Sequence, residues 1–404
     1  MPERRRGMRS LNGSAPRAFP FAEKGIGMSN SDSQLRERKD GVASRAANGG
    51  ALPADVQKKP RGRDTSIEAY RVFLMFMICF IHSVSMGIAP NQRLLGGLLW
   101  AVCGFVFISG WFGINFSASK LMRLLATAVF CGGLAAAIGY FSGMPVGSWD
   151  VVRWTMRRWF VCAYMVLMLL APFLNAAIDS PRGMRNGISA VVILAMWNWL
   201  STSRAGIKFG PLTAGLGDYT FTMMVVVYIV ARLIRKSCDG GGAVRASLFT
   251  VKTSVSAVLL LLALLVCLPH HFAIYSSPVA LCMAVAAFFL FRHVKPGKRL
   301  GSAVLFIAPS MLPVYLIHTN EVGFSAIKQI ERFLDGKGVP AFVFIPATAL
   351  AVFSACLAID MFRRGLCRLS GGFIKRISSV VDDLCNRIDM KICSALRGDG
   401  NAKS

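Results

Sequence analysis

Long apolar runs recur along most of the chain, and they constrain its fold more than any other feature. A helix needs roughly 20 mostly apolar residues to cross a hydrocarbon layer about 30 Å thick. Candidate runs begin near Tyr70, Leu95, Leu121, Trp159, Gly187, Tyr219, Thr253, Ser277, Ser302 and Ala341, and the fifth is short. Lipid-exposed backbone must satisfy its own hydrogen bonds, and none of these runs alternates as a barrel strand does. The sequence therefore predicts an all-α fold, a polytopic membrane helix bundle with about ten transmembrane helices.

The basic residues are distributed in a pattern that predicts topology. The formal net charge is +26, but most Lys and Arg residues lie before Glu68, from Arg363 onward and in the loops after every second run. The positive-inside rule then places both termini in the cytoplasm of a multi-pass protein of the cell (plasma) membrane. No basic patch is interleaved with aromatic residues, so we expect no nucleic-acid partner.

Three regions follow from this reading. Residues 1–63 are expected to form a disordered basic cytoplasmic arm, and residues 64–365 a membrane domain. Residues 366–404 form a cytoplasmic tail with an apolar stripe at helical spacing. That amphipathic tail could lie on lipid, pair with a second copy in a homo-oligomer, or have no special role.

Common cofactor and metal motifs are missing from the sequence. Most of the eleven cysteines fall inside apolar runs and no CxxC pair is present. There is also no glycine-rich phosphate loop, GxSxG elbow or HExxH run. We therefore expect neither a disulfide framework nor a bound metal.

The first apolar run contains the most informative polar residues. Arg71 and His82 are 11 residues apart, so they share one helix face with about 16 Å between them along the axis. Glu68 is placed to pair with Arg71 at the entrance. An Arg at a helix end can instead extend to lipid headgroups, and a buried His can be purely structural. Ionisable residues inside a membrane are nevertheless functional candidates by default.

A second group of candidates lies in the ninth run. Tyr315 and His318 are three residues apart and share a helix face, and Ser310 precedes them. Proton relay, acceptor binding and anchoring at the membrane interface all stay open for this group. Of the other polar residues, Asn175 is expected to cap its span beside Pro172.

Taken together, these motifs resemble the acyltransferase-3 family of integral-membrane acyltransferases, particularly bacterial enzymes that O-acetylate surface polysaccharides. The first-run pattern of an acidic residue, Arg, ten residues and His matches Glu68, Arg71 and His82. Four further segments match in order: FISGWFG (107–113), WFVCAYMVLMLLAPFLN (159–175), SPVALCMAVAAFFLF (277–291) and SMLPVYLIH (310–318). The resemblance covers about residues 65 to 365.

The resemblance implies an activity. The donor would be acyl-CoA, with acetyl-CoA the expected form. The acceptor would be a hydroxyl of a cell-envelope glycan. Arg71, Lys120 and Arg123 would bind the phosphates of coenzyme A, and Tyr315, His318 and Ser310 would contact the acceptor. His82 would act as the general base, assisted by Arg71 and Glu68, or as a nucleophile that forms an acyl-imidazole.

Two other function classes compete with this interpretation. A carrier or polysaccharide exporter would also need many spans, but the sequence shows no internal repeat and no matching pair of broken spans. A small-molecule sensor would depend on the amphipathic tail alone. An intramembrane His that shares a face with an entrance Arg favours catalysis.

Overall fold

The apolar runs fold as helices throughout the part of the chain that can be described. The computed structural model describes residues 63–147, 149–156, 158–202, 221–239, 250–267, 277–369, 380, 383, 384 and 387. No strand occurs within these ranges. Residues 1–62 of the predicted arm and most of the predicted tail lie outside them.

The helices keep the order of the predicted runs, with additional short helices between them. In chain order they are α2 (Thr65–Met86), α3 (Gln92–Leu98), α4 (Trp100–Phe112), α5 (Ala118–Phe141), α6 (Asp150–Met156), α7 (Trp159–Asp179), α8 (Gly183–Thr202), α9 (Phe221–Asp239), α11 (Val251–Cys267), α12 (Pro278–His293), α13 (Lys298–Ile307), the 3-10 turn η3 (Ala308–Ser310), α14 (Met311–His318), α15 (Glu321–Asp335) and α16 (Ala341–Leu369).

Six segments of the described chain are long and apolar enough to cross a membrane. They are Thr65–Met86, Leu94–Phe112, Ala118–Phe141, Trp159–Asp179, Lys298–His318 and Ala341–Leu366. Helices α11 and α12 are apolar but shorter, and α8 and α9 are helical without meeting the same criterion. The prediction of a polytopic helical membrane bundle is confirmed.

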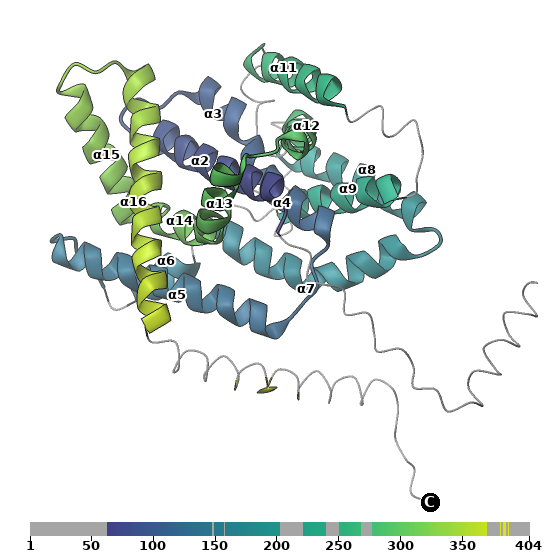
Figure 1. Cartoon of the computed structure of the whole chain (residues 1–404), viewed down its shortest axis with the longest axis horizontal. Coiled ribbons are helices and arrows are strands. Elements are labelled where there is room, and N and C mark those ends of the chain that lie inside the picture. Colours follow the sequence, from purple (N-terminus) through teal and green to yellow (C-terminus); the bar gives the residue numbers. More distant parts are fainter. Residues whose placement is uncertain are drawn as a thin grey trace, which may run out of the picture. The chain divides into compact units, whose positions relative to one another are not determined.

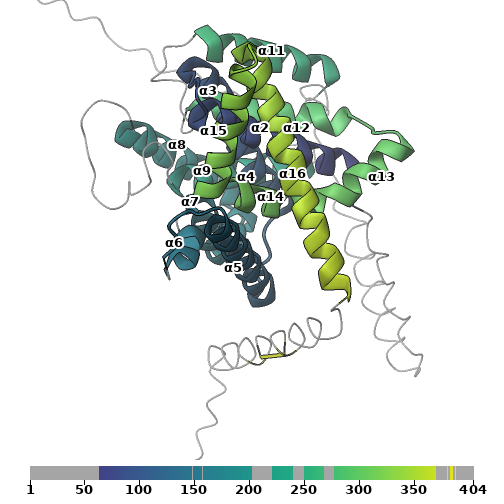
Figure 2. The ribbon, with the colours of Figure 1, turned by 90° about the vertical axis from the view of Figure 1, so that its left-hand side faces the viewer.

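Helix α2, which carries the Arg and His pattern, packs among many other helices. It contacts α4, α12, α13, α14 and α16, which lie around it (Figures 1 and 2). The side chain of Asp64 accepts a hydrogen bond from the backbone N–H of Ser66 and so caps its first turn. Tyr70, Leu74 and Cys79 are fully buried. These contacts fix the rotation of α2 and therefore the direction of each of its polar side chains.

Two glycines allow α4 to approach its neighbours closely. A Cβ at Gly104 would lie 2.7 Å from a methyl group of Leu74 on α2. A Cβ at Gly110 would lie 2.6 Å from the backbone carbonyl oxygen of Tyr228 on α9. Small residues of this kind are typical of helix contacts inside membranes.

The span over Lys298–His318 is interrupted near its middle. Residues Ala308–Ser310 form a 3-10 turn, and Pro309 has no N–H to contribute to a helical ladder. Arg364 of α16 donates hydrogen bonds to the carbonyl oxygen of Phe306 and to Oγ of Ser310, at 2.9 and 3.2 Å. These bonds stabilise the interruption, because freed polar groups inside a membrane protein need new partners.

One expectation about a helix end is wrong. Asn175 was expected to cap a span beside Pro172, but α7 continues through both residues to Asp179. Instead, Asn175 accepts a hydrogen bond from the hydroxyl of Tyr228 at 2.8 Å and donates one to the carbonyl oxygen of Ile114 at 3.1 Å. The Ile114 N–H donates to the Tyr228 hydroxyl at 2.9 Å, which closes the ring of bonds. This ring links α7 and α9 to the segment that follows α4.

Candidate active site

Two adjoining cavities lie along one face of α2. The inner cavity has a volume of about 350 Å³ and is lined by both Arg71 and His82, as their 11-residue spacing predicts. The mouth cavity has a volume of about 630 Å³ and extends past the start of α5. The two share a wall formed by Arg63, Arg71, Ile108, Ser109, Leu124, Tyr164 and Leu312. We refer to the two cavities together as the passage.

Positive charge gathers at one end of the passage. Arg63, Arg71, Lys120 and Arg123 all line the mouth cavity. Such a set of cations suits phosphate groups, which Arg can bind through two parallel hydrogen bonds. Among the described residues, no group of three or more His, Cys, Asp or Glu side chains is arranged to hold a metal ion.

A buried carboxylate orients two of these cations. Glu68 is only 5% exposed, and its Oε1 atom lies 2.8 Å from Nη1 of Arg71 and 3.7 Å from Nε of Arg63. The pair with Arg71 has the predicted spacing of three residues along α2. Glu68 therefore fixes the position of the Arg71 guanidinium, whose side chain is one-third exposed in the passage.

At the other end of the passage, His82 contacts a second histidine. Its Nδ1 atom lies 2.9 Å from Nε2 of His318, with the ring centroids 5.0 Å apart. His318 is completely buried in α14. Its own Nδ1 atom lies 2.6 Å from the carbonyl oxygen of Val314, one helical turn earlier.

The carbonyl of Val314 determines which nitrogens carry protons. A carbonyl oxygen can only accept, so Nδ1 of His318 must be the donor in that hydrogen bond. With both rings neutral, Nε2 of His318 is then an acceptor, and Nδ1 of His82 donates to it. Nε2 of His82 is therefore the unprotonated nitrogen, and it belongs to the ring that lines the inner cavity. This nitrogen can accept a proton or act as a nucleophile.

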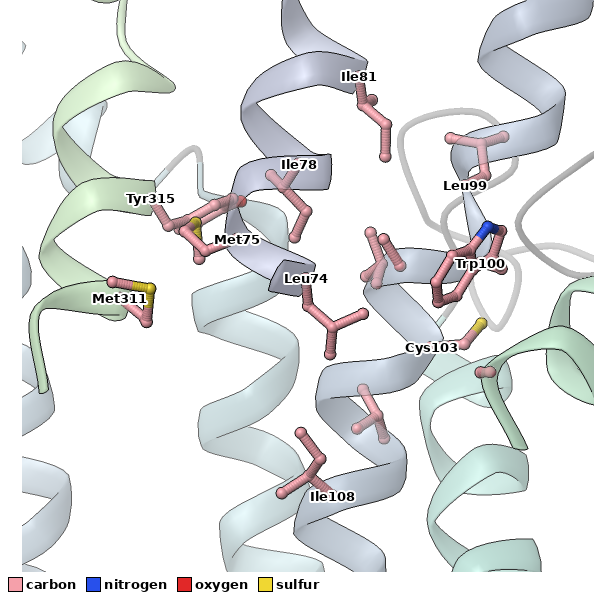
Figure 3. Packing of buried hydrophobic residues seen from close by; sticks show 14 of the residues in the cluster. Leu74, Met75, Ile78, Ile81, Leu99, Trp100, Cys103, Ile108, Met311 and Tyr315 are labelled. Atoms are coloured by element: carbon pink, nitrogen blue, oxygen red, sulfur yellow. The ribbon is translucent and has the colours of Figure 1, made fainter. Parts of the chain in front are cut away.

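Apolar and aromatic side chains form the walls around His82. Ile78, Ile81 and Leu99 extend between α2 and α4, while Met75 and Tyr315 lie toward α14 (Figure 3). Such a lining excludes water and strengthens electrostatic interactions within the cavity.

Aromatic rings also cover the histidine on other sides. The ring of Phe324, in α15, has its centroid 5.7 Å from that of His82. Phe160 packs edge-on against Tyr315 at 5.7 Å and stacks with Tyr164 at 6.0 Å. Helix α15 is strongly amphipathic, begins at the Asn320 cap and was not anticipated from the hydropathy of the sequence.

The structure gathers most of the candidate residues but not all of them. Arg71, His82 and Tyr315 line the inner cavity, while Lys120 and Arg123 line the mouth cavity. The remaining candidates are outside both cavities: Glu68 behind Arg71, His318 behind His82, and Ser310 where its Oγ atom accepts from Arg364.

Three polar residues that line both cavities were not among the candidates from the sequence. Arg63 was assigned to the N-terminal arm, although its side chain lines both cavities. Ser109 and Tyr164 also line both cavities, and they belong to segments quoted for the family resemblance without an individual role. The positions of Ser109 and Tyr164 depend on the packing of α4 and α7 against α9, which hydropathy does not report.

Comparisons with known proteins show the family of the chain. The model of the acyltransferase-3 family, described as an acyltransferase domain, matches residues 64–361. None of the curated proteins and none of the solved structures that were compared matches the chain. The matched range includes every residue of the passage except Arg63.

Proposed function

Because the chain belongs to the acyltransferase-3 family and is a multi-pass membrane acyltransferase, we propose that it transfers an acetyl group from acetyl-coenzyme A to a hydroxyl of a cell-envelope glycan. The observation that carries this proposal is the passage itself. It begins among four basic side chains and ends at His82. Coenzyme A has the same order of parts, with phosphates at one end and a thin arm that leads to the thioester.

The donor fits the passage in one direction. Its phosphates bind at the mouth, where Arg71, Lys120 and Arg123 lie with Arg63. The pantetheine arm then runs along α2, over the roughly 16 Å of helix axis that separates Arg71 from His82. The thioester reaches the apolar inner cavity, where the lining keeps competing water away from it.

The topology proposed from the charge distribution is consistent with this direction. The N-terminal end of α2 then faces the cytoplasm, which contains acyl-coenzyme A, and the protein lies in the plasma membrane. The acceptor approaches His82 from the opposite end of α2. Tyr315 lines the cavity near His82 and is placed to contact the acceptor.

In the proposed mechanism, His82 acts as the general base. Its Nε2 atom takes the proton of the acceptor hydroxyl while the hydroxyl oxygen attacks the thioester carbonyl carbon. The carbon–sulfur bond then breaks, and the thiolate of coenzyme A receives the proton from His82. General-base catalysis of this kind contributes about 10² to 10⁴ in rate.

His318 has a positioning role in this mechanism. When Nε2 of His82 takes up a proton, the ring becomes cationic, and its Nδ1–H bond to His318 becomes charge-assisted and stronger. Val314 in turn holds His318 in the tautomer that can accept. Ser310 has no part in the mechanism, because its hydroxyl binds Arg364 outside the cavities.

The test uses the full-length protein in membranes with radiolabelled acetyl-coenzyme A. His82→Asn retains a donor near the Nδ1 position but removes Nε2, so we expect loss of label transfer with normal protein abundance. Arg71→Gln should raise the KM for the donor, whereas Arg182→Gln, an exposed position outside the passage, should not. Undiminished transfer to envelope glycan by His82→Asn would refute the role of His82.

The same material separates direct transfer from a covalent path. In direct transfer, protein denatured after incubation with the labelled donor alone carries no label. An acyl-imidazole would leave label on wild-type protein, absent from His82→Asn, together with ping-pong kinetics.

A further inference from the structure

A pair of hydroxyl groups lies where the two cavities meet. Ser109 of α4 and Tyr164 of α7 both belong to the shared wall, and their oxygens are 3.2 Å apart. The other residues of the shared wall are three apolar side chains, Ile108, Leu124 and Leu312, and the two cations Arg63 and Arg71. Any ligand that runs from the mouth to His82 must pass this pair.

The pair has acceptor capacity only. The hydroxyl of Ser109 donates its single proton to the carbonyl oxygen of Phe105, 3.1 Å away. The hydroxyl of Tyr164 must therefore be the donor in its bond with Ser109. Both protons are used within the protein, and the remaining lone pairs of the two oxygens can bind only a group that brings its own hydrogen.

The position of both oxygens is fixed by packing. Ser109 is held by the bond to the preceding turn of α4. The ring of Tyr164 stacks on Phe160 with 14° between their planes. A site that is ordered before the ligand arrives loses little conformational entropy on binding.

We propose that the Ser109–Tyr164 pair is a binding subsite for an amide N–H group of the donor's pantetheine arm, an inference that rests on the proposed function. The arm contains two amides between its phosphate end and its thioester end. The other side chains of the shared wall are apolar or, as guanidinium groups, can only donate. An amide N–H without a partner there is costly, and the two acceptor oxygens remove that cost. The pair thus selects a donor with an amide-containing arm over a simple thioester.

The experiment compares donors as well as variants. The donors are acetyl-pantetheine and two analogues in which one or the other amide N–H is replaced by an ester oxygen. For wild type, one analogue should have kcat/KM lowered about 3- to 10-fold, the range expected from one neutral hydrogen bond. Tyr164→Phe should lower kcat/KM for acetyl-pantetheine by a similar factor relative to wild type. With the sensitive ester analogue, Tyr164→Phe and wild type should have the same kcat/KM.

Matched controls test whether the effect is specific to the subsite. Tyr140→Phe makes the same change at a side chain that is 70% exposed. Ser302→Ala removes a hydroxyl that, like that of Ser109, donates to the carbonyl oxygen four residues earlier. Neither control should alter the ratio between acetyl-pantetheine and its analogues.

The outcomes separate this inference from the proposed function. If wild type transfers no acetyl group from acetyl-coenzyme A, which is assayed beside the pantetheine donors, the proposed function itself fails. If wild type is active but does not distinguish the analogues, the subsite is wrong while the acyltransferase stands. The subsite would also be wrong if the loss from Tyr164→Phe and the loss from the ester analogue multiply when the two are combined. That result would show that the Tyr164 hydroxyl and the amide N–H of the donor do not interact.

Discussion

Replacement of His318 by Phe tests the two-histidine arrangement most directly. Phe retains the ring and much of the volume but removes the acceptor that lies 2.9 Å from Nδ1 of His82. In the transition state this hydrogen bond is made to a cationic ring, and bonds to charged groups contribute about 1.5 to 3 kcal/mol. The same bond to the neutral ring in the ground state contributes about 0.5 to 1.5 kcal/mol, so only the difference of about 1 to 1.5 kcal/mol affects kcat. At about 1.4 kcal/mol for each factor of ten, kcat should fall roughly 5- to 13-fold.

Binding of the donor should change little in the same variant. His318 does not line either cavity of the passage, so the KM for acetyl-coenzyme A should stay within about twofold of wild type. Steady-state release of free coenzyme A by purified protein gives both constants. The variant also removes the buried hydrogen bond between His82 and His318, so we expect a lower melting temperature, which is measured separately.

Two further variants isolate the chemical role of His318. His318→Gln can place a carboxamide oxygen near the position of the missing nitrogen, so it should recover part of the lost kcat. Since the two histidines act as one unit, His82→Asn combined with His318→Phe should be no slower than His82→Asn alone. Wild-type kcat in His318→Phe, or losses that multiply in the double variant, would refute the reasoning.

Three other features give independent predictions. Because exposed charges at the mouth are screened by salt, the KM for acetyl-coenzyme A should rise with ionic strength, while that for acetyl-pantetheine, which lacks the phosphates, should stay constant. Burial raises the pKa of the Glu331 carboxyl, although the hydrogen bond from the Ile88 N–H at 2.7 Å opposes the shift. The folded state therefore holds this proton more tightly than the unfolded state does. Folding stability should decline as pH rises from the ordinary pKa near 4.5 through the raised value. Glu331→Gln retains an acceptor for Ile88 and should show a flatter melting temperature over that window; an identical profile would contradict this. Gly110→Ala should lower the melting temperature, because its Cβ would collide with the Tyr228 backbone, whereas Gly133→Ala meets no atom within 4 Å and should not; equal effects would exclude the close contact.

The helices could be predicted from the sequence because lipid leaves the backbone few alternatives. An apolar run must satisfy its own hydrogen bonds, so hydropathy alone located α2, α5, α7 and α16. The shared face of Arg71 and His82 follows from helical periodicity in the same way. Helix α15 escaped prediction because its charged residues lower its hydropathy, even though its apolar stripe packs against the bundle.

The contact between His82 and His318 could not be predicted from one sequence. Each lies in a helical apolar run, but periodicity gives no information on how α2 and α14 are rotated relative to each other. That rotation depends on the interruption at Ala308–Ser310 and on the bonds that Arg364 makes to it from α16. A pattern search finds the two histidines separately. They come into contact only through the packing of α2, α14 and α16.

The 3-10 turn at Ala308–Ser310 also explains how the span over Lys298–His318 places Tyr315 and His318 near His82. A continuous helix over Lys298–His318 would present one fixed stripe to α2, and its register would be set by lipid-facing packing along the whole span. The 3-10 turn divides it, so that α14 can align Tyr315 with the inner cavity and His318 with His82 independently of α13. Arg364 binds polar groups at the turn, and therefore supports the contact between His82 and His318 from a position on α16. We expect Arg364→Leu to lower kcat through misplacement of His318 while the KM for the donor changes less, since the basic mouth does not depend on α14.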